Sequence, residues 1–216
     1  MSSEEPAATA PAPRPELTVT DPKAMRALAH PLRMALLELF RVSPTLTATQ
    51  ASEALGESPA NCAFHLRTLA KYGFVEEAGG GRGRERPWRR MHESLNITSR
   101  QQVDPRARAA AEVLGSAFRD RWLDRIRRAF TARAWPGEWD ETATASNSVR
   151  FLTPAEAVEM TAELRQVVDR YRDRNYDPAS RPEGALPVDI NIFSYPRADL
   201  SGITPDADGT QSQDIS

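Results

Sequence analysis

The chain has 216 residues, of which 40% are hydrophobic and 27% are charged, and its formal net charge at pH 7 is −2. This length allows one large domain or two small ones, and the composition is sufficient for a packed core. The chain has no run of ~20 apolar residues long enough to span a membrane, and its first residues lack the apolar stretch of a signal peptide. The single cysteine excludes an intramolecular disulfide, so we expect a cytoplasmic protein.

Charge is distributed unevenly along the chain. Residues 21–100 hold 12 Lys and Arg against 8 Asp and Glu, whereas residues 101–216 hold 15 against 19. Excess positive charge suits a surface that neutralises phosphates. Chance clustering of surface arginines would give the same imbalance, so the asymmetry supports nucleic-acid binding only weakly.

The N-terminal part contains a tail followed by helical sequence. Residues 1–20 are rich in Pro and Ala and show no apolar period, which predicts a disordered tail. Residues 21–40 open with Asp-Pro, an N-cap followed by proline at the first helical position, and carry one apolar stripe at helical spacing. Pro31 interrupts the stripe, so we expect two helices or a break at His30.

The next segment has the pattern of a helix-turn-helix unit. A capping box over residues 47–50 opens a short helix that ends near Gly56. Ser58 then caps a second helix, predicted over residues 59–72. Two helices separated by so short a turn, the second about four turns long, are typical of this motif.

The outward face of the second helix is suited to reading bases. At about 100° per residue, Cys62, Leu66 and Leu69 share one face, which we expect to pack inward. On the other side, Asn61 could pair with adenine and Phe64 could touch a thymine methyl group. An ordinary solvated helix face is the alternative, which an outward Phe makes less favourable. The remaining outward side chains, suited to methyl, phosphate or guanine contacts, are Ala60, Arg67, Thr68 and Lys71.

A basic hairpin is expected directly after this helix. Residues 74–78 and 86–91 are strand-like and flank a stretch rich in Gly and Arg at residues 79–85. Glycines would let such a tip follow a phosphate backbone or minor groove closely. The stretch lacks the Gly-Lys-Ser/Thr ending of a nucleotide-binding loop. We therefore expect a DNA-contacting wing whose main contacts are Arg82, Arg84 and Arg86. A flexible polar hairpin without DNA contacts is the alternative.

A long helix with an aromatic-rich end follows. Residues 104–133 carry an apolar residue at every fourth position, which indicates packing on another helix, in the same chain or in a second copy. Aromatic residues concentrate at its end and just beyond. They could line a pocket for an apolar or aromatic effector, although a core or dimer seam is the simpler interpretation. The residues of this possible pocket are Phe118, Trp122, Trp135 and Trp139.

The rest of the chain predicts a small α+β module. Residues 148–152 suggest a strand, residues 153–171 begin with a capping box and continue as an amphipathic helix, and residues 188–193 alternate as a strand does. We therefore expect a helical dimerisation and α+β effector module over residues 104–195. Residues 196–216 are expected to be a second disordered tail.

These motifs resemble those of a known family. Residues 27–33, Ala-Leu-Ala-His-Pro-Leu-Arg, resemble the A-L-x-H-P-x-R opening of ArsR-type winged helix-turn-helix repressors. Residues 58–66 are similar to their recognition helix, residues 69–75 and the wing continue the match, and the resemblance covers residues 21–95. It implies a homodimer that binds an operator and is released by a signal. The positions that it places near DNA are Ser58, Asn61, Ala63, Phe64 and His65.

The C-terminal half is similar, less closely, to the tail of a group of ArsR-like regulators common in actinobacteria. The matching features are the Trp-rich segment, the Leu-Thr-Pro-Ala-Glu run at residues 152–156 and the Asp-Arg-Tyr-Arg run at residues 169–172. This similarity implies that the module is a C-terminal extension of the DNA-binding domain.

The chain departs from the metal-sensing members of that family. Residues 47–56 contain no Cys or His, whereas those members carry a Cys-x-Cys pattern there. Cys62 and His65 are three residues apart, but Cys62 belongs to the inward face, and His30 and His92 have no partner at ligand spacing. We expect no metal site and no cofactor.

Together these patterns predict a mainly α fold with a small β part: a winged helix-turn-helix domain over residues 21–95, a long helix and a small α+β module. The predicted function is sequence-specific regulation of transcription by a dimer on a double-stranded DNA operator. A repressor released by a small molecule or other signal fits best. The sequence contains no catalytic motif, so we expect no enzyme activity. The alternative is a protein-interaction adaptor whose wing binds an acidic partner.

Overall fold

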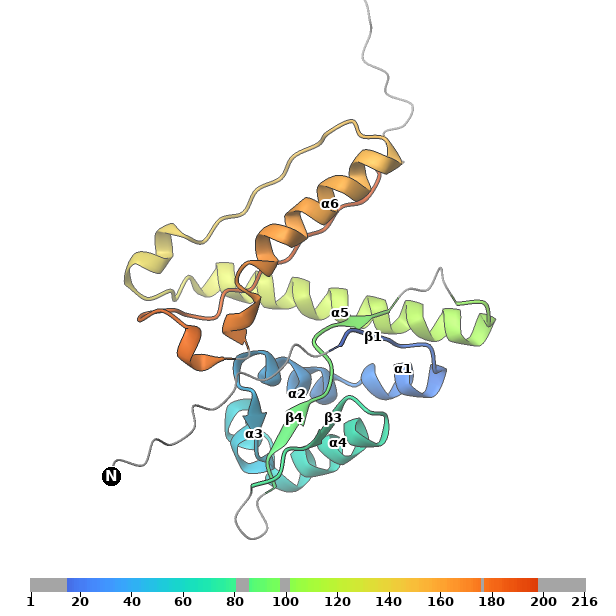
Figure 1. Cartoon of the computed structure of the whole chain (residues 1–216), viewed down its shortest axis with the longest axis vertical. Coiled ribbons are helices and arrows are strands. Elements are labelled where there is room, and N and C mark those ends of the chain that lie inside the picture. Colours follow the sequence, from blue (N-terminus) through green and yellow to red (C-terminus); the bar gives the residue numbers. More distant parts are fainter. Residues whose placement is uncertain (1–14, 81–85, 98–101, 176, 198–216) are drawn as a thin grey trace, which may run out of the picture.

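The computed structural model describes residues 15–80, 86–97, 102–175 and 177–197. Four short helices and a small sheet form one end of the molecule. A long helix crosses over them, and a further helix with extended segments lies beyond it (Figure 1). No helix in the described ranges is long and apolar enough to cross a membrane. The predicted class, mainly α with a winged helix-turn-helix domain, is confirmed.

The first two helices, α1 (Pro22–Leu28) and α2 (Pro31–Val42), are separated at the predicted break. The Asp21 carboxylate accepts from the backbone N–H of Lys23 at 2.9 Å and so caps α1. His30 caps α2 in the same way, because its Nδ1 accepts from the N–H of Leu32 at 3.2 Å. The break at residue 30 is therefore a capped helix start.

Helices α3 (Ala48–Leu55) and α4 (Pro59–Lys71) form the helix-turn-helix unit. Both hydrogen bonds of the predicted capping box are present, between Thr47 and Gln50. Gly56 ends α3 with φ of 68°, a left-handed conformation that glycine adopts without a steric penalty. These local signals fix the three-residue gap between the two helices.

A three-stranded antiparallel sheet completes the winged domain. Its strand order is β2 (Thr45–Leu46), β4 (Trp88–Arg90), β3 (Val75–Glu77). The predicted hairpin is confirmed in β3 and β4. Strand β2 was not predicted, because two residues between helices carry too little pattern to reveal a strand.

The core joins the winged domain to helix α5 (Pro105–Ala132). Leu28, Leu36 and Leu66 are completely buried, and Leu114 of α5 is buried with them. The first half of the predicted apolar stripe of α5 therefore has its partner within the same chain, chiefly in α1.

The segment before α1 corrects one prediction. Residues 1–20 were expected to be a disordered tail, yet β1 (Leu17–Thr18) pairs in parallel with β5 (Leu95–Asn96). Val19 is buried beside this pair. Composition could not reveal the pairing, because the partner strand is distant in sequence. The rest of that tail, residues 1–14, lies outside the described residues. The same is true of residues 198–216 of the predicted C-terminal tail.

The C-terminal part is helical and extended, without the expected strands. Its regular elements are the short 3-10 helices η2 (Gly137–Glu141), η3 (Arg172–Asn175) and η4 (Pro178–Ser180), and helix α6 (Pro154–Asp169). The predicted strands at residues 148–152 and 188–193 are wrong: both segments are extended but pair with no other strand among the described residues. The alternation at 188–193 also does not separate two faces, because the consecutive Ile192 and Phe193 both contact one cavity.

Candidate nucleic-acid interface

Helix α4 presents one buried and one open face, as predicted. Cys62, Leu66 and Leu69 are each 0% exposed and pack into the core. Phe64 points away from them and is 57% exposed. The Pro at the first helical position and the Ser58 cap fix where the helix begins, and this start sets which residues face outward.

Polar groups of the open face are already held by neighbours in the free protein. The side-chain amide of Asn61 donates to Glu57 at 2.9 Å, and the hydroxyl of Thr68 donates to the carbonyl of Phe64 at 3.0 Å. Ser58 accepts from the backbone N–H of Asn61 and acts as a helix cap. The face is completed by Ala60, Arg67 and Lys71, which are exposed, and by Ala63, which is partly buried.

His65 is buried and does not lie on the open face of α4. The side chain is 6% exposed, and its Nδ1 lies 3.2 Å from a guanidinium nitrogen of Arg33. Its ring stacks on that of His30 with centroids 4.4 Å apart. Arg33 in turn donates to the carbonyl of Ala27. Residues from both family-like motifs therefore meet at one structural junction between α2 and α4.

The titration of this junction follows from its burial. Desolvation lowers the pKa of His65, and the nearby His30 and Arg33 lower it further. Desolvation and Arg33 also lower the pKa of His30. Both Nδ1 atoms accept a hydrogen bond from an N–H group, Leu32 for His30 and Arg33 for His65, so both rings are neutral at neutral pH.

The base of the wing lies beside α4. Arg86 pairs with Glu77 and Arg89 with Glu76, each at 2.8 Å across β3 and β4. Arg86 is thus placed as predicted, on the hairpin next to the helix-turn-helix unit. The other two wing arginines of the prediction, Arg82 and Arg84, lie outside the described residues.

A hollow of about 340 Å³ separates α4 from the wing. Arg67 of α4 and Arg86 of the wing both line it, opposite Thr47 and Thr49 at the start of α3. The N-terminus of a helix carries partial positive charge and free backbone N–H groups, so it favours anions. The two threonines were not predicted as site residues, although the capping box marks them as the start of a helix.

The predicted aromatic pocket is only half formed. Phe118 and Trp122 lie together on α5, with ring centroids 5.9 Å apart, and line a cavity. Trp135 instead packs edge-on against Phe130, and Trp139 is in the following 3-10 helix; neither lines that cavity. The prediction placed them together because they are close in sequence, but the chain turns away after α5.

The lone cysteine is placed as predicted, in the core. Burial raises the pKa of the Cys62 thiol, and Glu57 raises it further, which disfavours the thiolate that a metal would need. In the part of the chain that the structure describes, no group of three or more His, Cys, Asp or Glu side chains could hold a metal ion.

A short helix, a turn, an outward helix and an antiparallel wing together define a winged helix-turn-helix domain. Residues 28–78 match the protein family described as "Helix-turn-helix domain". Helix-turn-helix domains are DNA-binding elements of transcription regulators, and this chain contains one.

One similar solved structure is the transcriptional regulator homologue protein from Pyrococcus horikoshii OT3. It is 17% identical, and the match covers 48% of this chain and 93% of that chain with a TM-score of 0.29. A likeness of this degree carries no functional argument. No curated protein shows significant similarity to the chain.

Proposed function

We propose that the protein is a sequence-specific, DNA-binding transcription regulator that inserts α4 into the major groove. The observation that carries this proposal is the open face of α4, where Phe64 is 57% exposed between Asn61 and Arg67. An exposed phenyl ring on an otherwise polar helix costs solvation unless it serves a contact. A thymine methyl group is the contact that the major groove offers to such a ring.

The wing and the hollow beside α4 support the same arrangement. Arg67 and Arg86 line the hollow, and Arg82 and Arg84 precede Arg86 in the sequence. With α4 in the groove, these arginines and the start of α3 would lie along the flanking phosphates. Phosphate contacts position a protein on DNA, and base contacts specify the sequence.

We further propose that the protein acts as a homodimeric repressor of the ArsR type. Two copies of α4 would then read two half-sites one DNA turn apart, about 34–36 Å. A signal that changes the spacing between the two helices would release the operator. The apolar side chains that α5 leaves exposed, Val113 at 62% and Leu123 at 49%, support a seam between copies along this helix.

Selection of bound sequences from a random pool of double-stranded DNA tests this function. The expected result is a two-fold symmetric motif whose half-sites are about one turn apart. Affinity for that motif should fall steeply with salt, because phosphate contacts release counterions. Enrichment of no motif, together with weak binding to all DNA, would reject sequence-specific recognition. Salt-dependent capture of an acidic protein without DNA binding would indicate the adaptor instead.

A further inference from the structure

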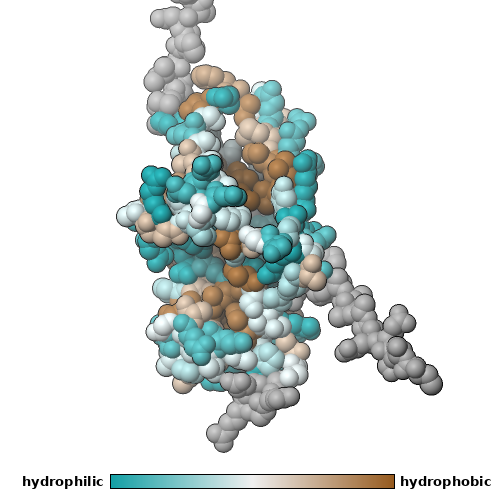
Figure 2. All heavy atoms as spheres, turned by 90° about the vertical axis from the view of Figure 1, so that its left-hand side faces the viewer, coloured by the Kyte–Doolittle hydropathy of each residue, from teal (hydrophilic) through white to brown (hydrophobic). Residues whose placement is uncertain are grey.

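A cavity of about 280 Å³ lies between the DNA-binding domain and the C-terminal part. Its walls come from α2, α5, the chain at β4 and β5, and the extended segment that contains Ile192 and Phe193. Leu37, Phe118 and Trp122 make the inner wall apolar, and the ring of Phe193 lies 6.2 Å from that of Trp122. Figure 2 shows apolar residues gathered in hollowed parts of the surface on one side of the molecule. The volume is just below the usual range for ligand pockets, about 300–1,000 Å³, so the ligand must be small.

A glycine lies where α5 forms part of the wall of this cavity. Gly115 lines the cavity and lies well inside a helix of 28 residues. Glycine within a helix costs roughly 1 kcal/mol relative to alanine, so helix stability does not account for it. A Cβ at this position would lie 3.2 Å from a guanidinium nitrogen of Arg119. The missing side chain therefore leaves room for the Arg119 guanidinium to lie against this turn of α5, at the cavity.

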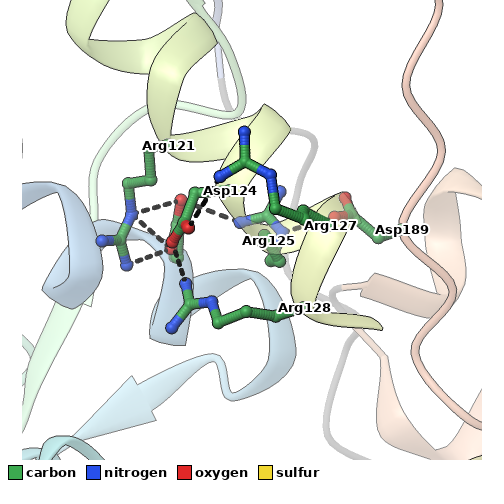
Figure 3. A network of polar contacts seen from close by, with 7 residues as sticks. Arg121, Asp124, Arg125, Arg127, Arg128 and Asp189 are labelled. Atoms are coloured by element: carbon green, nitrogen blue, oxygen red, sulfur yellow. Dashed lines mark hydrogen bonds and ion pairs between the residues drawn. The ribbon is translucent and has the colours of Figure 1, made fainter. Parts of the chain in front are cut away.

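The charges around the cavity favour an anion. Glu38 is the acidic residue of the lining, and it is already held by Arg121 at 2.6 Å and Arg125 at 2.9 Å (Figure 3). Arg41 and Arg119 also line the cavity, and neither side chain forms an ion pair or hydrogen bond among the described residues. The cavity thus combines an apolar wall with uncompensated positive charge.

An ion pair joins the outer wall to helix α5. Arg125 bridges Glu38 of α2 and Asp189 of the C-terminal segment, with 2.5 Å between its Nε and the Asp189 carboxylate (Figure 3). Ile192 and Phe193 follow that aspartate and remain 43% and 44% exposed. The segment covers the cavity only partly, so a small molecule has access from solvent.

We propose that this cavity binds a small organic acid, with its apolar body against Phe118 and Trp122 and its carboxylate at Arg41 and Arg119. The acid is the effector of the regulator; this role, unlike the binding itself, rests on the proposed function. Helix α2 provides a route for the effect, because the same helix packs against α4. A ligand between α2 and α5 would bias how α4 is held relative to the dimer seam.

Titration calorimetry with two matched probe pairs tests the binding site without DNA. The probes are 1-naphthoate with its neutral isostere 1-naphthamide, and octanoate with octanamide. We expect one acid to bind per chain and the corresponding amide to bind roughly tenfold more weakly, because it loses the charge-assisted hydrogen bonds. Absence of binding by both acids, or equal binding of acid and amide, would overturn the proposal.

Variants on α5 localise the site. Gly115→Leu should fill the cavity and abolish binding while keeping or raising the melting temperature, since leucine favours helix. Ser116→Leu, next to it on an exposed part of the helix, is the matched control and should bind as wild type. Arg119→Gln should remove the preference for acid over amide, whereas Arg127→Gln on the same helix should keep it. Binding that survives Gly115→Leu would place the acid elsewhere and reject the cavity.

A separate measurement distinguishes this proposal from the proposed function. Operator affinity with and without the better acid should differ in wild type and not in Gly115→Leu. If the acid binds but no DNA motif is enriched, the binding site is supported and the proposed regulatory function is rejected. If a motif exists and the acid binds without changing operator affinity, the cavity is a binding site but not the effector site.

Discussion

Phe64 is the side chain whose position most directly connects the fold with base recognition. Replacing Phe64 or Asn61 with alanine should relax sequence preference, because each removes a contact to a base edge. A good bidentate contact is worth roughly 1–3 kcal/mol of discrimination against the wrong base. The measurement compares affinity for the selected operator with affinity for single-base variants of it. Lys23→Ala, on an exposed part of α1, should leave the preference unchanged, and an unchanged motif in both test variants would move recognition away from α4.

The stacked pair of half-buried His30 and buried His65 predicts a loss of stability in mild acid. Their pKa values are lowered in the folded state by burial and by Arg33, so the unfolded chain binds more protons below the ordinary pKa of 6.5. Their contribution is therefore complete above that pH and is lost as the pH falls toward the lowered values. Urea unfolding should give a smaller free energy at about pH 5.5 than at about pH 7.5.

The double variant His30→Gln, His65→Gln provides the control for this effect. Glutamine does not titrate, so the difference between the two pH values should shrink relative to wild type. An equal difference in both proteins would assign the acid sensitivity to other groups.

The buried position of Cys62 predicts that metal ions do not release the protein from DNA through this residue. Its thiol is buried and its pKa is raised, so the thiolate needed for metal binding is disfavoured. Cys62→Ala should leave operator affinity nearly unchanged in titrations with zinc, cadmium and arsenite. Metal-dependent release from DNA that disappears in Cys62→Ala would make α4 itself the sensor and contradict this expectation.

At the scale of elements, the wing predicts a general electrostatic contribution. Arg82→Ala and Arg84→Ala should each weaken binding to all sequences alike and lower the salt slope by about one. Glu77→Gln should act in the opposite direction, because it frees Arg86 from its 2.8 Å ion pair. Affinities measured across a salt series on specific and random DNA check both signs. Wild-type slopes in the two arginine variants would show that the wing does not touch DNA.

Elements with strong local signals could be predicted from the sequence. The caps at Asp21, Thr47, Ser58 and Thr153 each begin a helix in the structure. Their hydrogen bonds involve residues two or three positions apart, so the sequence contains all the information needed. The same holds for the inward face of α4.

Elements that depend on distant partners could not be predicted. Strand β1 exists because Leu17 pairs with Leu95, and the alternating residues 188–193 remain unpaired because no neighbouring strand meets them among the described residues. His65 is similar: helical geometry left it beside the inward face, and only the approach of Arg33 from α2 draws it in. Long-range contacts decide these cases.

The whole molecule presents a testable dimer seam. Phe118 is part of the internal cavity, so Val113, which is 62% exposed on α5, is the better position for a test. Val113→Asp should give a folded monomer, because a charge in an apolar seam costs several kcal/mol unless it is paired. Light scattering measures the mass, and circular dichroism verifies the helix content. Glu112→Gln, at the adjacent exposed position, should remain dimeric; a monomeric wild-type protein would reject the seam.

The parallel pairing of β1 with β5 means that the chain enters and leaves the winged domain at the same place. The backbone N–H of Leu17 donates to the carbonyl of Ser94 and that of Val19 to the carbonyl of Asn96, each at 3.0 Å. Helix α5 begins at Pro105. A recombinant fragment that begins at Asp21 would lack strand β1 and so lose this pairing, whereas one that begins at Pro15 would keep it. A molecule that binds the N-terminal segment would therefore act on the β1–β5 pair, which precedes helix α5 in the chain.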